Sequence, residues 1–397
     1  MKNRIYKINN LMLFILIIIA FRTFYLSLNT ALNSSIDMQW YPTLQLWGLG
    51  DFSKFTNPYL AYISGDRFLS NGPNYMPLLY FLMFPFALLN WENAKLVFGI
   101  FNIICFILSA FLIYKNSQNK ILFYFLTILT LVGYAFPNVV GNAQTATIIG
   151  LFICIAYYFR NKPIVLIIAL SVISVKHSFG VPILLGFFLA GFKKEVIYSC
   201  FFSFFFVCLF AFILDSNPIS ILQSISQVNS MYTSPNSLGG PSDLFSLSQK
   251  LYKTPYSIIL FFNIAIYLSF VFLIFKFRPS INLIIASSIL LSLFSLPHLG
   301  YDSYMLFIAM ALISEGLKPN NYAFIALIFC SAFLWRGEIL KKYIDSLSNK
   351  IITAWGGEIN NNTFWSMDMG VPFCILICIV LIVIFYSLLI RKEISEK

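Results

Sequence analysis

Five residues of this chain combine a reactive side chain with an apolar neighbourhood. Asp37 follows directly on the first long apolar run, and Lys176 with His177 interrupts another. His298 and Asp302 stand four residues apart where a further apolar run ends. Ionisable groups at such places are costly, and a carboxylate can take up a proton while cations bind an anion. A lysine at the edge of an apolar segment is also explained by snorkelling to the membrane surface.

The other positions have structural explanations as well. Asp37 fits a helix-end charge in the headgroup zone, and Trp40 and Tyr41 behind it fit an interfacial aromatic belt. A spacing of four residues puts His298 and Asp302 on one helical face if the helix continues, so Asp302 could serve only to hold His298. The chemical and the structural explanations therefore both stand at this point.

The composition is typical of a membrane protein. Of 397 residues, 59% are hydrophobic and only 10% are charged, and 44 are phenylalanine. The net charge of +11 comes from short basic clusters between apolar runs, which argues against a nucleic-acid partner and in favour of cytoplasmic loops. The seven cysteines all fall inside apolar runs, so we expect neither a disulfide framework nor a zinc site.

A polytopic helical bundle must hold these residues in place. A spanning helix needs roughly 20 apolar residues, and we expect about twelve such spans in a single domain over residues 1–397, the first of them a retained helix. The fold class is therefore all-α. The expected spans are about 11–28, 96–114, 121–138, 143–159, 163–175, 179–192, 196–214, 256–275, 281–296, 303–316, 322–334 and 371–389.

The basic clusters orient this bundle. They fall in alternate loops, so both termini are expected in the cytoplasm of a plasma or inner membrane protein. The proline-containing run at 76–89 would reverse every later loop if it crossed, so we expect an interfacial or re-entrant helix there. Long outer loops are then expected at about 29–95, 215–255 and 335–370, on the same side as Asp37, Lys176 and His298.

The order of motifs over residues 37 to 306 resembles glycosyltransferase family 87, a mannosyltransferase-like family in the C superfamily of polyprenyl-phosphate-dependent membrane glycosyltransferases. No single motif is specific, but their order and spacing together are. The matching residues are Asp37, Trp40, Tyr41, Gly50, Asn57, Pro58, Tyr59, Tyr75, Pro77, Pro85, Gly141, Asn142, Gln144, Lys176, Asn236, Ser237, Leu238, Gly239, Pro297, His298, Tyr301 and Asp302.

This resemblance implies a C-superfamily-like fold and a hexosyltransferase. The expected reaction moves a mannose-like hexose from a polyprenyl-phosphate sugar to a lipid or glycan acceptor on the extracytoplasmic face, with inversion. The donor carries its own leaving group, so one carboxylate suffices as base, and Asp37 is the candidate. His298, oriented by Asp302, completes the catalytic set.

The remaining candidate residues are expected to bind the substrates. Lys176, His177 and His298 are expected at the donor phosphate. Substrate contacts are expected from Trp40, Tyr41, Asn57, Tyr59, Tyr75, Asn142, Gln144, Asn236 and Tyr301. The partners are then the lipid-linked donor, a glycolipid or glycan acceptor and membrane lipids.

Two departures and two rival functions qualify the resemblance. The family commonly has a second proline after the early-loop tyrosine and one after the lysine, where this chain has Met76 and His177. A transporter or flippase would usually show internal repeats, and a ligase or polymerase of lipid-linked glycans arginine-rich outer loops. We expect no cofactor, and no metal because the chain has no DxD pair.

Overall fold

The computed structural model describes residues 2–33, 75–117, 119–133, 135–213, 215–232, 255–296, 298, 300–316, 377, 381, 382 and 384. Every regular element among them is a helix, which confirms the expected all-α class for this part of the chain. The helices divide into two compact units, which are described one at a time.

The first unit, called here the Lys176 unit, covers residues 21–116 and 137–232. Its helices are α1 (Lys2–Asn33) from Phe21 onward, α4 (Leu78–Ala87), α5 (Trp91–Asn116), most of α7 (Ala135–Gly141), α8 (Ala146–Tyr158), α9 (Pro163–Ile173), α10 (His177–Leu189), α11 (Lys193–Ile213) and α12 (Pro218–Tyr232).

Local sequence explains where these helices begin and break. The Asn90 side chain accepts a hydrogen bond from the Asn93 amide at 3.0 Å and so caps α5. Pro163 opens α9, where its missing amide hydrogen costs nothing. Gly191, with φ of 102°, turns the chain between α10 and α11, in a conformation that favours glycine.

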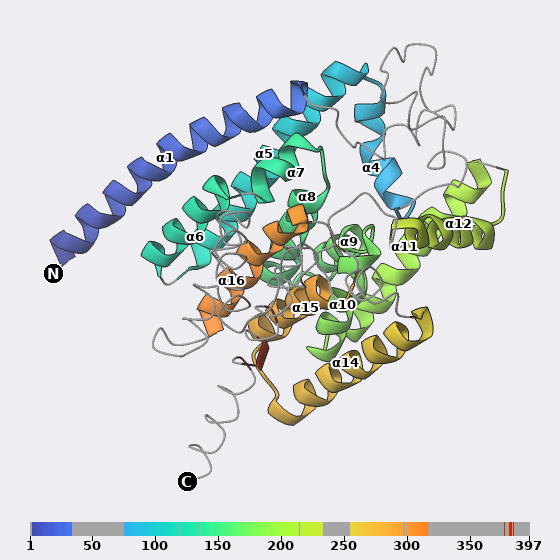
Figure 1. The fold of residues 1–397 in the computed structure, drawn as a ribbon. Helices are drawn as coiled ribbons and strands as arrows, with labels where there is room; N and C mark the ends of the chain where they lie inside the picture. Colours follow the sequence, from blue (N-terminus) through green and yellow to red (C-terminus); the bar gives the residue numbers. More distant parts are fainter. Residues whose placement is uncertain are drawn as a thin grey trace, which may run out of the picture. The chain divides into compact units, whose positions relative to one another are not determined.

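Aromatic side chains and a pair of hydrogen-bonded serines pack the helices of this unit together. The short helix α4 packs on α5, α9 and α11, and the rings of Tyr80 and Phe210 stack at 5.6 Å between their centroids (Figure 1). Between α9 and α11 the hydroxyls of Ser174 and Ser203 lie 2.9 Å apart. Small polar side chains of this kind link helices in an apolar environment.

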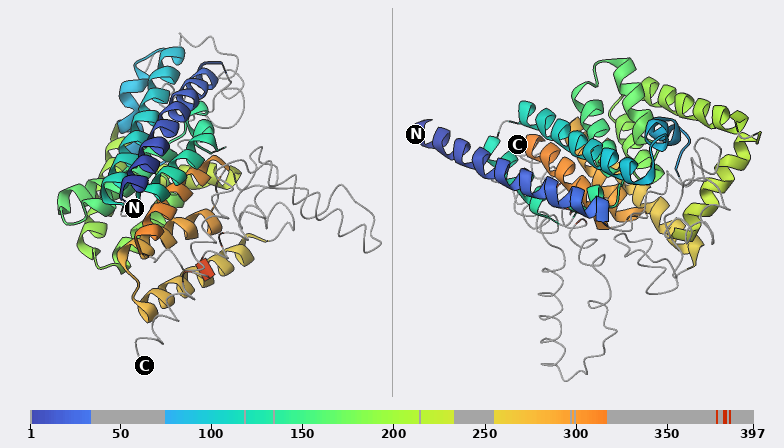
Figure 2. Two further views of the ribbon diagram at one scale, coloured as in Figure 1. Left: turned by 90° about the vertical axis from the view of Figure 1, so that its left-hand side faces the viewer. Right: turned by 90° about the horizontal axis from the view of Figure 1, so that it is seen from above.

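The second unit, called the His298 unit, contains the first part of α1, α6 (Lys120–Val132), α14 (Tyr256–Phe277), α15 (Ile281–Ser295), the 3-10 helix η3 (Gly300–Tyr304) and α16 (Met305–Gly316). α15 packs against α16 and α14, and α16 also contacts α6 (Figures 1 and 2). Asn282 of α15 donates a hydrogen bond at 3.1 Å to the carbonyl of Leu312 in α16. α15 is buried on nearly all sides, which accounts for a sequence that contains only apolar and small or uncharged polar residues.

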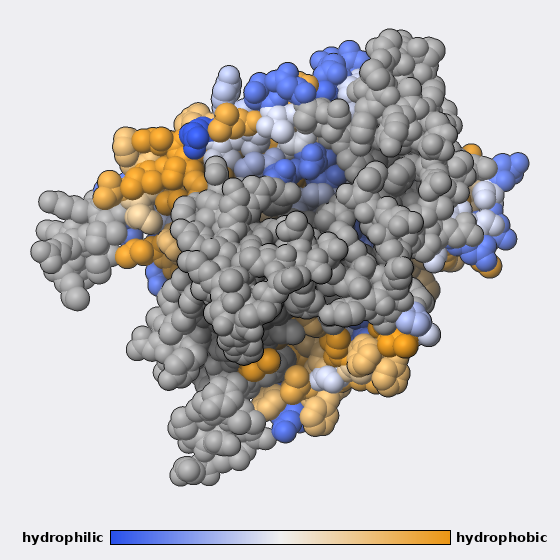
Figure 3. Space-filling view, in the orientation of Figure 1, coloured by the Kyte–Doolittle hydropathy of each residue, from blue (hydrophilic) through white to orange (hydrophobic). Residues whose placement is uncertain are grey.

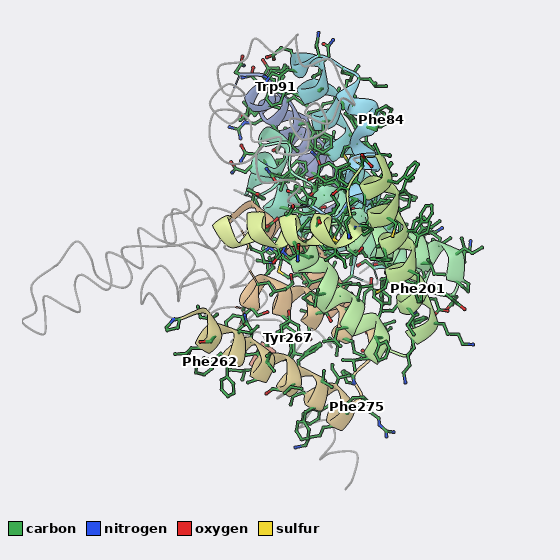
Figure 4. The ribbon with its side chains drawn as sticks, turned by 90° about the vertical axis from the view of Figure 1, so that its right-hand side faces the viewer. Phe84, Trp91, Phe201, Phe262, Tyr267 and Phe275 are labelled. Atoms are coloured by element: carbon green, nitrogen blue, oxygen red, sulfur yellow. The ribbon has the colours of Figure 1, made fainter. Side chains whose placement is uncertain are left out.

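The outer face of α14 contrasts with buried α15. Phe262 and Phe275 point away from the unit, while Tyr267 lies on the opposite side, where its hydroxyl meets Ser295 at 3.3 Å (Figure 4). The space-filling view shows hydrophobic surface over this helix (Figure 3). α11 likewise exposes Phe201, which is 68% accessible. Such wide apolar faces fit contact with lipid.

Four of the described helices are long and apolar enough to cross a membrane, which supports the expected membrane protein. They are Asn9–Asn33, Trp91–Asn116, Lys193–Ile213 and Ser257–Phe277, with a fifth span if α6 and α7 are one broken helix. The finer prediction of about twelve spans is not reached by the described helices. The predicted spans at 322–334 and 371–389 lie largely outside the described residues.

The length of the remaining helices explains this difference. α4, α8, α9, α10 and α15 are apolar but contain only 10 to 15 residues each. At about 1.5 Å per residue, a 13-residue helix covers about 20 Å, against a hydrocarbon core of about 30 Å. At 10 residues, α4 is the shortest of them, and that the run at 76–89 does not cross stays a prediction.

Candidate functional site

Several predicted site residues lie outside the described part of the chain. They are Asp37, Trp40, Tyr41, Asn57, Tyr59 and Asn236. Their predicted roles, including that of Asp37 as base, stay predictions. The other candidates fall into three groups, two in the Lys176 unit and one in the His298 unit.

Lys176 and His177 form the turn between α9 and α10. Lys176 has an extended backbone (φ −106°, ψ 96°), and its carbonyl accepts hydrogen bonds from the amides of Phe179 and Gly180 at 2.9 and 2.8 Å. The Lys176 ammonium lies 5.4 Å from the centroid of the Phe179 ring. Both Lys176 and His177 are half-buried. The turn thus presents a partly desolvated cation, which strengthens its attraction for an anion.

Gly180 makes this turn possible. A Cβ atom at this position would lie 2.7 Å from the Cα of Ser174, which is backbone and cannot move aside. The first turn of α10 can therefore fold back closely on the end of α9 only with glycine here. Sequence reasoning identified Lys176 and His177 as an interruption of an apolar run but gave Gly180 no role.

The structure joins Tyr75 to the Lys176 turn. The amide of Met76 donates a hydrogen bond of 3.1 Å to the carbonyl of Val175, so two segments far apart in the sequence meet next to Lys176. Tyr75 is buried, and its own amide faces the hydroxyl of Tyr80 at 3.4 Å. Two predicted site residues, Tyr75 and Lys176, are therefore brought to one place.

The second group lies at the carboxyl end of α1. The turn that follows α7 contains Asn142 and Gln144, with Ala143 in the left-handed region at φ of 48°. Gln144 is buried, and its side-chain amide donates to the carbonyl of Asn142 at 3.2 Å. A Cβ atom on Gly141 would meet the side chain of Thr30 at 3.0 Å, so this turn packs against the last turns of α1.

Lys95 belongs to the same group and was missed by sequence reasoning. Its ammonium donates to the carbonyl of Leu32 at 3.0 Å and pairs with Glu92 at 2.8 Å, although the lysine is only 3% accessible. A cation at the carboxyl end of a helix offsets the partial negative charge of the unpaired carbonyls. The available signal was the Glu92 and Lys95 spacing of three at the start of an apolar helix.

α4 connects the segment beside the Lys176 turn to the start of α5. It begins just after Met76, beside the Lys176 turn, and ends just before α5, whose first turns carry Lys95 (Figure 1). Ten residues at about 1.5 Å each make α4 about 15 Å long. Tyr75 thus lies beside the Lys176 turn, while Asn142 and Gln144 follow α7, where Gly141 packs on α1. Buried residues next to both groups, Tyr75, Ala143 and Val175, belong to one hydrophobic core.

The third group is centred on His298 in the other unit. The Nδ1 atom of His298 lies 3.0 Å from the Oδ2 atom of Asp302, and its Nε2 atom lies 3.0 Å from the hydroxyl of Ser292. His298 is 4% accessible and Asp302 1%. The expected contact between His298 and Asp302 is confirmed, while Ser292 was not anticipated. Tyr301, the remaining substrate candidate, is half-buried and lies next to Asp302 in the 3-10 helix η3.

The route to the His298 contact differs from the predicted one. α15 ends at Ser295, and the chain resumes as the 3-10 helix Gly300–Tyr304, so the two residues do not share a continuous α-helix. His298 and Asp302 meet because the turn after α15 brings His298 back over the last turns of that helix, beside Ser292. Burial of an imidazole and a carboxylate together requires such mutual hydrogen bonding.

These groups can supply protonation and anion binding. Within the described ranges, no three His, Cys, Asp or Glu side chains gather in a way that could hold a metal ion. Lys176 offers a positive charge at a turn, and the His298 and Asp302 pair offers an imidazole held in one orientation. Compared with protein-family models, curated proteins and solved structures, the chain matches none.

Proposed function

We propose that the protein is an integral membrane glycosyltransferase that uses a polyprenyl-phosphate sugar as donor. It transfers a hexose, mannose-like in the family that the sequence resembles, to a lipid or glycan acceptor on the extracytoplasmic face. The observation that carries the proposal is the half-buried Lys176 turn, because a cation kept partly away from water suits a phosphate. Its junction with Tyr75 adds a second residue of the resemblance at the same place.

The reaction needs one base and one anion-binding group. Asp37 takes the proton from the acceptor hydroxyl while the acceptor oxygen forms its bond to the anomeric carbon. The bond between that carbon and the phosphate oxygen breaks on the opposite face, so the anomeric centre is inverted. The electron pair leaves with the lipid phosphate, and Lys176 and His177 balance the charge that develops there.

The surrounding apolar helices suit a lipid-linked substrate. In our topology of about twelve spans, α9 and α10 are too short for two full spans, so they form a hairpin whose tip, Lys176 and His177, lies below the outer surface. Asp37, Lys176 and His298 then face the extracytoplasmic side, and both termini the cytoplasm. A polyprenyl chain can lie against exposed apolar helix faces such as that of α11, which presents Phe201 and Phe205.

The test uses purified full-length protein in detergent with a panel of polyprenyl-phosphate sugars and acceptors. We expect transfer with at least one donor, and Asp37→Asn should lower turnover by at least about 100-fold with donor binding retained. Asp215→Asn is a matched control, since Asp215 is an exposed carboxylate outside the helices. Normal transfer by a folded Asp37→Asn protein would contradict the mechanism, and donor binding with vectorial movement but no transfer would favour a flippase.

A further inference from the structure

Ser292 completes a continuous hydrogen-bonded chain with His298 and Asp302. The hydroxyl of Ser292 lies 3.0 Å from Nε2 of His298, and Nδ1 of the same ring lies 3.0 Å from the Asp302 carboxylate. Ser292 is fully buried, as is Asp302. Hydroxyl, imidazole and carboxylate thus follow one another inside the His298 unit, contributed by α15, the following turn and η3.

The chemistry of the three groups assigns their donors and acceptors. An ionised carboxylate only accepts, so the Nδ1 atom of His298 carries a proton and donates it to Asp302. Nε2 then has two possible states, a lone pair in the neutral ring and an N–H in the charged one. A hydroxyl can serve both states, because it donates to the lone pair and accepts from the N–H. Alanine could serve neither.

We propose that Ser292 is a positioning residue that lets His298 gain and lose a proton at Nε2 while the imidazole stays buried and hydrogen-bonded. Without Ser292 the Nε2 N–H of the charged ring would lose its hydrogen bond to this hydroxyl, and a buried N–H that loses an acceptor costs more than a lone pair that loses a donor. The value of this exchange for sugar transfer rests on the proposed function, for which the sequence puts His298 in the catalytic set. The hydrogen-bonding role itself does not depend on that function.

Among the described residues, Asp302 is the charged group that contacts His298. α15, η3 and α16 contain no lysine or arginine. The other titratable side chains on the elements packed around this group are Tyr301 and Tyr304 of η3, Tyr256, Tyr267 and Lys276 of α14, Glu315 of α16, and Lys120 and Tyr124 of α6.

The same helix offers a matched control for Ser292. Ser288 is one turn earlier on α15 and equally buried, and its hydroxyl donates to the carbonyl of Ile284 at 2.9 Å. Ser288→Ala therefore removes a buried serine hydroxyl of α15 without touching His298. Ser292→Thr keeps the hydroxyl and is the variant that should restore the parent behaviour.

The decisive measurement is nitrogen NMR of full-length protein labelled with ¹⁵N-histidine. The chain has only two histidines, so a His177→Gln background leaves the His298 ring as the single imidazole signal. We expect Ser292→Ala to move the titration of Nε2 to lower pH by about one unit, because the protonated form loses its acceptor. Ser292→Thr should titrate like the parent, and so should Ser288→Ala.

Two further results separate this proposal from the proposed function. In proteins with His177 intact, the pH profile of sugar transfer should shift with Ser292→Ala in the direction and size seen by NMR, and not with Ser288→Ala. If the parent transfers no sugar but its NMR titration responds to Ser292→Ala, the function is overturned and the role of Ser292 stands. If Ser292→Ala, or Ser292→Gly where alanine does not fold, titrates like Ser288→Ala, the role of Ser292 is overturned.

Discussion

Lys176 and His298 are both ionisable groups in apolar surroundings, but they differ in burial and in their hydrogen-bond partners. Lys176 is half-buried at a helix turn, with its ammonium over an aromatic ring. His298 is fully buried, and its two ring nitrogens face Asp302 and Ser292. Partial exposure keeps the cost of a charge low and leaves it accessible to a ligand, whereas complete burial requires partners within the protein. The first arrangement suits binding, and the second suits a group of fixed orientation.

Asp302→Ala should have the largest effect and tests the buried half of this comparison. Removing one member of a buried pair leaves the other without its partner, at a cost of about 3–5 kcal/mol. We expect a clear fall in the thermal unfolding midpoint in detergent, and a smaller one for Asp302→Asn, which retains an acceptor oxygen. An unfolding midpoint of Asp302→Ala that is no lower than that of Lys176→Ala would contradict this comparison.

Lys176→Ala tests the exposed half and should change binding more than stability. A charge-assisted hydrogen bond to the donor phosphate contributes about 1.5–3 kcal/mol, which corresponds to about a 10- to 100-fold rise in the donor KM. Lys176→Arg should lose less, because charge rather than shape is what the phosphate requires. If alanine, arginine and parent proteins have equal donor KM, Lys176 only snorkels.

Gly180→Ala tests whether the Lys176 turn depends on its tight backbone. The added Cβ atom would lie 2.7 Å from the Cα of Ser174, so we expect a cost of about 1–3 kcal/mol and weaker donor binding. Gly99→Ala is the control, since its Cβ would meet the movable end of the Leu28 side chain at 2.9 Å. Equal unfolding midpoints for the two variants would show that the close approach at Gly180 is easily relieved.

Ser203→Ala should have the smallest effect. It removes the hydroxyl that meets Ser174 between α11 and α9, a hydrogen bond worth about 0.6 kcal/mol in a membrane protein. Because Ser174 precedes the Lys176 turn, the donor KM measures whether this contact also positions the lysine. A change in KM as large as that of Lys176→Ala would mean that the turn is far less rigid than its backbone hydrogen bonds suggest.

The all-α class could be predicted from the sequence, because the long apolar runs of this chain favour membrane helices over other regular structure. Sequence reasoning located α9 at 163–175 against an observed Pro163–Ile173, and α10 at 179–192 against His177–Leu189. It could not separate membrane-crossing helices from short buried ones, since both are apolar on all sides. Length alone distinguishes α15, which is buried, from α14, which has an exposed aromatic face.

The candidate site was predictable where side-chain chemistry carried the signal. The four-residue spacing of His298 and Asp302 indicated their contact. Ser292 gave no such signal, because serines in apolar helices commonly bond only their own helix, as Ser288 does. The junction between Met76 and Val175 uses backbone atoms, which every residue has, so no residue type could reveal it.

That backbone junction has a consequence for how the protein is made. About a hundred residues separate Met76 from Val175, and at about 5–20 residues per second α4 leaves the ribosome about 5–20 seconds before its partner exists. During that interval α4 is too short to settle across the membrane and lacks the surfaces of α9 and α11 on which it packs. The junction at the Lys176 turn therefore forms only after α9 has been made, and a chain arrested before α9 should leave α4 open to proteolysis.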